Sequence, residues 1–175
     1  MPLSTQAVPA WQGVNHIALA TPDLDATIHF YQDVLGLRLL ANLAASDLHG
    51  RHCVLWPGGS GLDLHFFELA DAQIFTHPDA LSSLHFVPGA LQHISFTLPD
   101  AEAGRAMWER LNTLGIQTTE IMEQRPIYNF GFLDNNGIQV EVAWFKPGVA
   151  PPNLDAILEH EHRVGDEPSM FALPS

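Results

Sequence analysis

The 175-residue sequence predicts an α+β protein made of two tandem modules, each with a strand, a helix and three further strands. A His-Ile pair followed by Pro-Asp occurs at His16 and recurs 77 residues later at His93. Each copy continues into helical spacing of apolar residues. Each then ends in an alternating run after a glycine, Gly61 or Gly137, and these glycines are 76 residues apart. A spacing kept to within one residue over whole modules indicates an internal repeat.

The opening strand of each module is predicted from alternation of apolar and polar residues, which leaves one apolar face. The Asp that follows, Asp23 or Asp100, is a favourable N-cap for the next helix. Helical spacing of apolar residues runs from there toward Gly36 in the first module and toward Gly115 in the second. Each opening strand is therefore expected to lead directly into a helix.

Three shorter strands are predicted after each helix. They are 38–43, 51–56 and 62–67 in the first module, and 117–122, 127–133 and 138–144 in the second. The modules are expected to span 12–68 and 89–145. Residues 69–88 would form a linker long enough for a short helix or lid, and 146–175 a C-terminal tail.

Composition narrows the class of partner. Lys and Arg total 7 against 20 acidic residues, giving a formal charge of −13. Nucleic acid and anionic membranes are therefore unsuited as main partners, because both need clustered cations. The single cysteine excludes an internal disulfide, and no apolar run approaches the length of a membrane span. The first residues of the sequence show no signal-peptide pattern, so we expect a cytoplasmic protein. With nucleic acid and membranes disfavoured, we expect its partner to be a small molecule.

The sequence resembles the vicinal oxygen chelate superfamily, which includes glyoxalase I, extradiol dioxygenases, methylmalonyl-CoA epimerase, and fosfomycin- and bleomycin-resistance proteins. The resemblance covers roughly residues 12–145. The segments that carry it are Asn15-His16-Ile17, Phe30-Tyr31 with Val34 to Leu37, His93-Ile94, Tyr128 to Phe132, and Asp134 to Glu141. It implies two βαβββ modules that form a cup-shaped mixed sheet with the helices outside.

The resemblance also implies one divalent metal ion per chain, Fe²⁺ or one of Mn²⁺, Ni²⁺, Zn²⁺ and Co²⁺. The implied ligands are His16, His65, His93 and Glu141. Their spacing agrees independently. His16 and His93 lie at the same place in the two opening strands. His65 and Glu141 each follow the aligned glycine by four residues, on the face opposite the aliphatic row.

A histidine at position 65 departs from the family pattern, where glyoxalases and epimerases usually have Glu or Gln and dioxygenases have no ligand. His65 could be a fourth ligand, a general base or a hydrogen-bonding residue of the pocket. We assign candidate catalytic roles to His65, Tyr128 and Glu141. The candidate substrate-binding residues are Arg51, His52, Trp56, Phe67, Arg125 and Phe130.

The predicted function is that of a metal-dependent enzyme whose substrate chelates the metal through two neighbouring oxygens. Its chemistry would be extradiol-dioxygenase-like if His65 leaves a position open, and glyoxalase- or lyase-like if that position is filled. The alternative is a protein that binds an antibiotic or another small molecule without turnover. We expect a homodimer, with exchange of modules between chains left open. Metal assays must also allow for His160 and His162, which lie in an acidic tail segment able to bind adventitious ions.

Overall fold

The chain divides into two compact units, Met1–Gln73 and Ile74–Ser175. A computed structural model describes residues 13–47, 49–59, 62–74, 81, 91–124 and 126–149. Most of the predicted linker and nearly all of the predicted tail lie outside these ranges, and so does the proposed lid. In the part of the chain that is described, no helix is long and apolar enough to cross a membrane.

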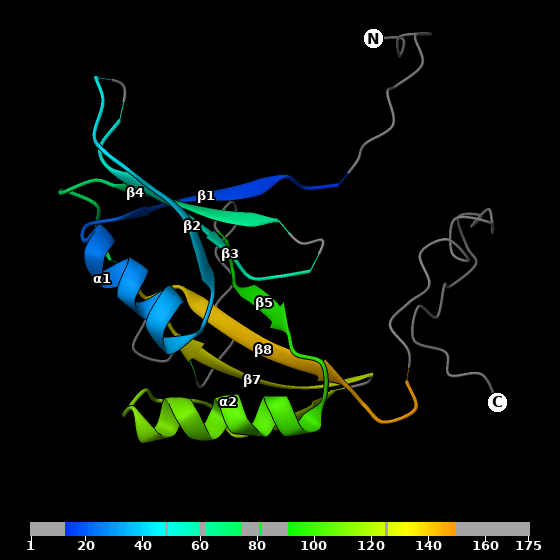
Figure 1. The fold of residues 1–175 in the computed structure, drawn as a ribbon. Coiled ribbons are helices and arrows are strands. Elements are labelled where there is room, and N and C mark those ends of the chain that lie inside the picture. The colour runs from blue at the N-terminus through cyan, green and yellow to red at the C-terminus, as the bar shows by residue number, and fades with distance from the viewer. Residues whose placement is uncertain are drawn as a thin grey trace, which may run out of the picture. The chain divides into compact units, whose positions relative to one another are not determined.

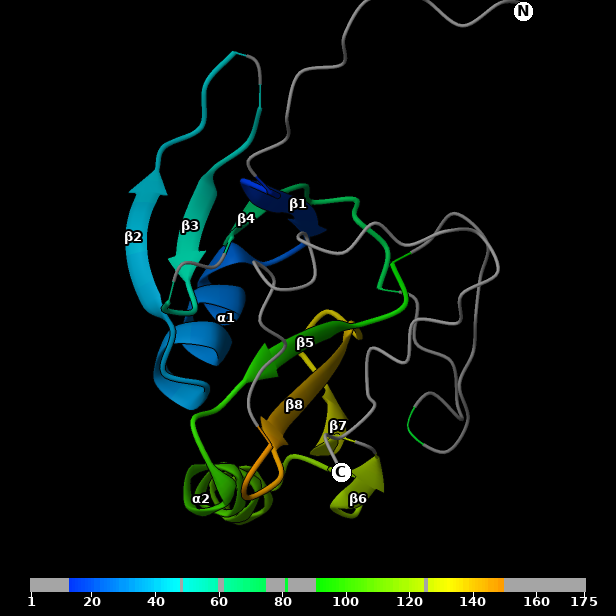
Figure 2. The same cartoon turned by 90° about the vertical axis from the view of Figure 1, so that its right-hand side faces the viewer.

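The first unit is one four-stranded sheet with a helical segment on one face (Figures 1 and 2). Its elements are β1 (His16–Thr21), α1 (Leu24–Ile28), the π-helical turn η1 (His29–Val34), β2 (Arg38–Leu43), β3 (His52–Trp56) and β4 (Asp63–Glu68). The strand order is β1-β4-β3-β2. β1 is parallel to β4, and the other neighbours are antiparallel.

The second unit repeats this arrangement. Its elements are β5 (Ile94–Thr97), α2 (Ala101–Thr113), β6 (Met122–Gln124), β7 (Ile127–Leu133) and β8 (Gln139–Phe145). The strand order is β5-β8-β7-β6, again with the first and last strands parallel. The predicted pair of βαβββ modules is therefore confirmed.

The register repeats as well as the topology. Ile17 pairs with Leu64 in the first unit, and Ile94 pairs with Val140 in the second. These pairs are related by the same sequence offsets, 77 and 76, as the motifs. Residues at equivalent places in the two sheets can therefore be matched one to one.

Each sheet has a core face under its own helix. In the first unit Leu64 and Phe66 are fully buried, and the Tyr31 ring lies 5.0 Å from that of Phe66. In the second unit α2 packs on β7 and β8, as Figure 1 shows, with Trp144 beneath Gly104. Each large side chain buried in this way contributes about 1.5–3 kcal/mol. The opposite face of each sheet, away from its own helix, is called the helix-free face below.

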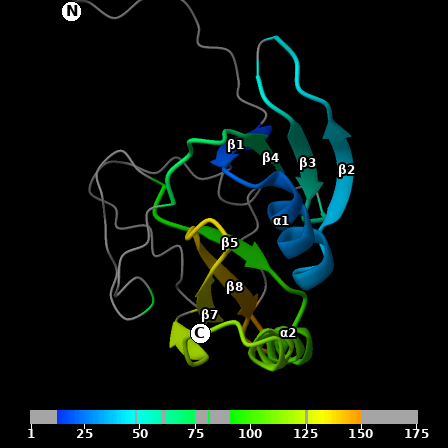
Figure 3. The same ribbon diagram turned by 90° about the vertical axis from the view of Figure 1, so that its left-hand side faces the viewer.

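Both helices begin as the sequence predicts. Asp23 accepts a hydrogen bond from the backbone of Ala26, and Asp100 does so from Ala103, each at 2.9 Å. The first helix differs from expectation, because it widens into η1 after Ile28. Figure 3 shows this helical segment from its outer side. The widened segment places the adjacent residues Phe30 and Tyr31 both in the core.

The strand predicted at 117–122 is also displaced. Thr118 forms only an isolated bridge with Phe132, and regular pairing begins at Met122. One backbone hydrogen bond is kept here, from Thr119 N–H to the Gly131 carbonyl at 2.8 Å. Side-chain bonds supplement it: Asn112 donates to Thr118 Oγ1, and Thr119 Oγ1 accepts from the Gly131 backbone N–H. Local bonds between side chain and backbone are typical of Thr and Asn.

Candidate metal site

Two implied ligands meet on the helix-free face of the first unit. His16 lies in β1 and His65 in the neighbouring β4, and their rings stack with centroids 4.4 Å apart. His65 alternates with the buried Leu64 and Phe66, which turns it away from α1. Burial lowers the pKa of His65, and the nearby His16 and His52 rings lower it further. His65 is thereby favoured in its neutral form, the form of imidazole that binds metals.

The ring of His16 is oriented by the residue before it. His16 Nδ1 lies 2.8 Å from the side-chain oxygen of Asn15. Because an amide oxygen only accepts, His16 Nδ1 carries the proton of this bond, and Nε2 keeps its lone pair. Metal-binding histidines are commonly held in this way by a hydrogen bond at the other ring nitrogen.

The second unit places a carboxylate where the first has an imidazole. His65 pairs with Ala18 in the register, and Glu141 pairs with Ser95 at the equivalent place. Both oxygens of Glu141 are held, one by Ser95 Oγ at 2.7 Å and the other by the side-chain amide of Asn129 at 2.9 Å. Asn129 is fully buried. The carboxylate is therefore held in one orientation on the helix-free face.

His93 immediately precedes β5, at the place that His16 has in the first unit. Its Nδ1 contacts the side-chain oxygen of Gln92. Asn15 and Gln92 thus form the same contact in the two units. Neither residue was assigned a role from the sequence, although a carboxamide directly before each His is a visible signal.

These residues fit a divalent metal by the chemistry of their donors. Each unit offers two groups: an imidazole pair in the first, and an imidazole with a carboxylate in the second. Within the described residues no three His, Cys, Asp or Glu side chains are grouped closely enough to hold an ion. Nitrogen and carboxylate donors in this combination suit Fe²⁺, Mn²⁺, Co²⁺, Ni²⁺ or Zn²⁺.

Three candidate substrate contacts lie on the same helix-free face as the histidine pair. His52 and Phe67 face each other across β3 and β4 with rings stacked at 4.7 Å, and the His52 ring lies 6.1 Å from that of His65. Trp56 is on the same face of β3 by strand alternation. His52 Nδ1 is buried without a hydrogen-bond partner among the described residues. These rings give the helix-free face of the first unit an aromatic surface that includes the polar atom His52 Nδ1.

Two predicted site residues, Tyr128 and Phe130, lie on the core face of the second unit. Tyr128 and Phe130 pair with Trp144 and Val142, and their rings lie near Trp144 on the core face, opposite Glu141. Phe130 is fully buried there. Their alternation with Asn129 is the physical reason: a residue next to one that faces Glu141 must face the helix. We therefore leave Tyr128 and Phe130 out of the proposed site.

Arg51 is engaged in an ion pair next to α1. Its guanidinium donates to both oxygens of Asp25, at 2.6 and 3.2 Å, and lies 3.5 Å from Glu68. This pairing lowers the pKa of Asp25 and raises that of Arg51. Arg51 therefore stabilises the start of the helix. Arg125, the other cation in the prediction, lies outside the described residues.

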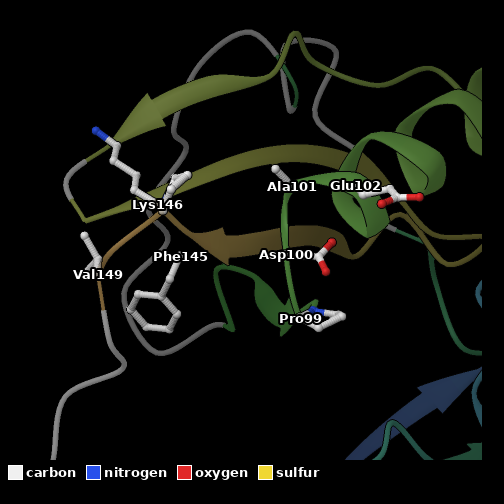
Figure 4. A pocket seen from close by; sticks show the side chains of 8 residues that line it. Pro99, Asp100, Ala101, Glu102, Phe145, Lys146 and Val149 are labelled. Carbon is white, nitrogen blue, oxygen red and sulfur yellow. The ribbon is translucent and has the colours of Figure 1, made fainter.

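A pocket of about 440 Å³ in the second unit lies between the start of α2 and the end of β8 (Figure 4). None of the predicted site residues lines it. Two of its polar groups are already engaged, since Asp100 caps α2 and Lys146 pairs with Glu123 at 2.5 Å. It is therefore not a candidate for the chelating site.

The structure thus combines duplicated βαβββ units with imidazole or carboxylate groups on the helix-free face of each unit. The chain belongs to the Glyoxalase/Bleomycin resistance protein/Dioxygenase superfamily, whose sequence model matches residues 13–142.

Solved structures with the same fold include a glyoxylase/bleomycin resistance protein/dioxygenase domain from Frankia sp. EAN1pec. It is 22% identical, with a TM-score of 0.64, over 80% of this chain and 96% of that one. A glyoxalase/dioxygenase from Nostoc punctiforme is 20% identical, with a TM-score of 0.62, over 82% and 99%. TnmS3, an antibiotic-binding protein from Streptomyces sp. CB03234, is 19% identical, with a TM-score of 0.59, over 79% and 100%.

Proposed function

We propose that this protein is a metal-dependent enzyme whose small substrate chelates a divalent cation through two neighbouring oxygens. His16, His65, His93 and Glu141 would hold the cation. The observation that carries the proposal is the repeated register: each unit has two donors at equivalent places on its helix-free face. A complete set would combine both units, within one chain or between two chains of a homodimer.

The state of the donors supports this role. Metal ligands must be unprotonated at the binding atom. His16 is held through Nδ1, and burial favours the neutral form of His65. Hydrogen bonds from Ser95 and Asn129 leave further lone pairs on the oxygens of Glu141. His16 and His65 therefore meet this requirement at their binding atoms.

A bound divalent cation would supply Lewis-acid stabilisation of negative charge on the two substrate oxygens. The residues of the chain would supply orientation. Ser95 and Asn129 keep the Glu141 carboxylate in place. His52 and Phe67 lie beside the histidine pair and would contact the remainder of the substrate. His52 Nδ1 could form a hydrogen bond with a polar substrate group.

Among the chemistries of the superfamily we favour the lyase or isomerase type. His65 has the same register position as Glu141, which supports a role as fourth donor rather than a residue outside the set. Four protein donors leave fewer positions free for oxygen and substrate together than three do. The cup closed by the two modules, the homodimer and the cytoplasmic location stay predictions.

The test is metal content and affinity in a background in which His160 and His162 are replaced by alanine. Single His16→Ala, His93→Ala and Glu141→Ala variants are compared with His29→Ala. His29 is an exposed control, because it lies on the helical segment and pairs with Asp33. We expect about one divalent ion per chain, lost in the three site variants and kept in the control. Metal that all the variants retain, or no stoichiometric metal, contradicts the proposal.

Binding without turnover is the second candidate. The aromatic surface of Phe67, His52 and Trp56 supports it, and TnmS3 shares the fold. Tight binding of an aromatic ligand that survives chelator treatment and the His93→Ala change would favour this candidate. Loss of ligand binding together with the metal would favour the enzyme. The His65→Ala variant separates the enzyme types: retention of iron with uptake of oxygen in the presence of a catechol would indicate a dioxygenase.

A further inference from the structure

In the second unit two side-chain amides are hydrogen-bonded in series, and the second amide contacts His93. Gln139, the first residue of β8, accepts a hydrogen bond from the amide nitrogen of Gln92 at 2.9 Å. The oxygen of the same Gln92 amide contacts His93 Nδ1. All three side chains are partly buried. The Gln92 amide therefore connects β8, the strand that contains Glu141, to the ring of His93.

The direction of these bonds determines the position of a proton on His93. An amide has a donor end and an acceptor end, so fixing one end fixes the other. With its nitrogen on Gln139, Gln92 presents oxygen to His93. An imidazole nitrogen that meets an oxygen acceptor must carry the hydrogen itself. His93 then has its proton on Nδ1 and a lone pair on Nε2.

The first unit has only half of this hydrogen-bonded arrangement. Asn15 contacts His16 in the same way, but Asp63 takes the place that Gln139 has in the second unit. No side-chain hydrogen bond between Asn15 and Asp63 is found among the described residues. Gln139 thus adds a constraint in the second unit that the repeat alone does not provide.

We propose that Gln92 and Gln139 are positioning residues that hold His93 as the Nδ1–H tautomer, with Nε2 free for a metal. The use of Nε2 rests on the proposed function, whereas the tautomer is a property of the protein alone. The other tautomer would have its proton on Nε2 and no lone pair there. Hydrogen bonds of this kind to ligating histidines typically change metal affinity by 10- to 100-fold.

The test is the tautomer of His93 in chelator-treated, ¹⁵N-labelled protein. It is measured by long-range ¹H–¹⁵N correlation at a pH where the histidines are neutral. His93→Ala assigns the signals. Two variants of Gln139 predict opposite results. Gln139→Glu can only accept from Gln92, so the Nδ1–H tautomer should persist. Gln139→Lys can only donate, so it should turn the Gln92 amide around and favour the Nε2–H tautomer.

A third variant links the tautomer to metal affinity. Gln92→Leu removes the contact with His93, and we expect a mixture of tautomers and about a tenfold loss of Zn²⁺ affinity. Unchanged amide spectra elsewhere establish that each variant is folded. An Nε2–H tautomer in the unaltered protein overturns the inference. The same tautomer in both Gln139 variants also overturns it.

The result is separable from the proposed function. If His93→Ala abolishes Zn²⁺ binding but Gln92→Leu leaves affinity and tautomer unchanged, the inference fails and the proposed function stands. If Zn²⁺ binding does not depend on His93 while the tautomer follows Gln139, the positioning role stands and the metal proposal fails.

Discussion

The side-chain amide of Asn129 donates a 2.9 Å hydrogen bond to Glu141 across the β7–β8 ladder, and Asn129 is completely buried. Within the part of the chain that the structure describes, the side-chain oxygen of Asn129 has no hydrogen-bond partner. Leaving a buried acceptor unpaired is unfavourable by about 1–3 kcal/mol. The contact with Glu141 is thus kept against an energetic penalty, which is expected where a carboxylate must be held for function.

Removing the hydrogen bond from Ser95 to Glu141 should weaken metal binding without unfolding the protein. Ser95 is exposed, so Ser95→Ala should leave the urea midpoint nearly unchanged and lower metal affinity several-fold, because one carboxylate oxygen loses its donor. Thr97→Ala is the matched control, two residues along the same strand and on the same face. Competition with a chelator measures the affinity. Equal affinities in the two variants would contradict the positioning role of Ser95.

Gly104→Ala should destabilise the second unit, although alanine favours helices. An added Cβ would lie 2.4 Å from the Trp144 ring, so overpacking is expected to cost about 1–3 kcal/mol. The gain in helix propensity offsets at most about 1 kcal/mol of this. Urea denaturation gives the difference. In a Trp144→Leu background the same change should cost less or become stabilising, and an equal cost in both backgrounds would exclude this contact as the cause.

The thiol of Cys53 should be inert in the folded protein. It is fully buried, and burial raises its pKa from 9.0 to about 11. At pH 8 we expect no reaction with a thiol reagent in buffer, and one thiol per chain in urea. Because the folded pKa is the higher one, this group stabilises the fold below about pH 9, and the contribution disappears as pH rises toward 11. Cys53→Ala should remove this part of the pH dependence.

Arg51→Ala should affect stability slightly and metal binding not at all. Its guanidinium pairs with the exposed Asp25 and is directed at α1. Exposed pairs are screened by salt, so the small drop in the urea midpoint should vanish at high ionic strength. Since pairing lowers the pKa of Asp25, the effect should also fade as pH falls below 3.8, the ordinary value for Asp. A substantial loss of substrate binding would instead favour the substrate-binding role predicted from the sequence.

The repeat in the sequence was sufficient to predict the fold. Strands 38–43 and 127–133 have the predicted bounds, since alternation and turn residues are local signals. The face of His65 also followed from alternation. The roles assigned to Tyr128 and Phe130 stay predictions, because aromatic character alone does not say which face of β7 these residues occupy.

The residues that support the candidate ligands were not predicted. Ser95 and Asn129 reach Glu141 from other strands, 46 and 12 residues away in sequence. Such partners depend on register between strands, which periodicity within one strand does not specify. Asn129 was nevertheless detectable as a lone polar residue in the apolar run of β7. The pairing of Gln92 with Gln139 depended on the same register.

The exchange of an imidazole for a carboxylate between the equivalent positions 65 and 141 has an electrostatic consequence. In the proposed metal centre, three imidazoles and one carboxylate would compensate only half the charge of a divalent ion, so the loaded centre would keep a net positive charge. The chain as a whole carries a formal charge of −13. An anionic reactant would then be repelled by the surface and attracted only at short range, where the ion's field is least screened. Its association should accelerate with ionic strength, opposite to the usual behaviour of an electrostatically steered substrate.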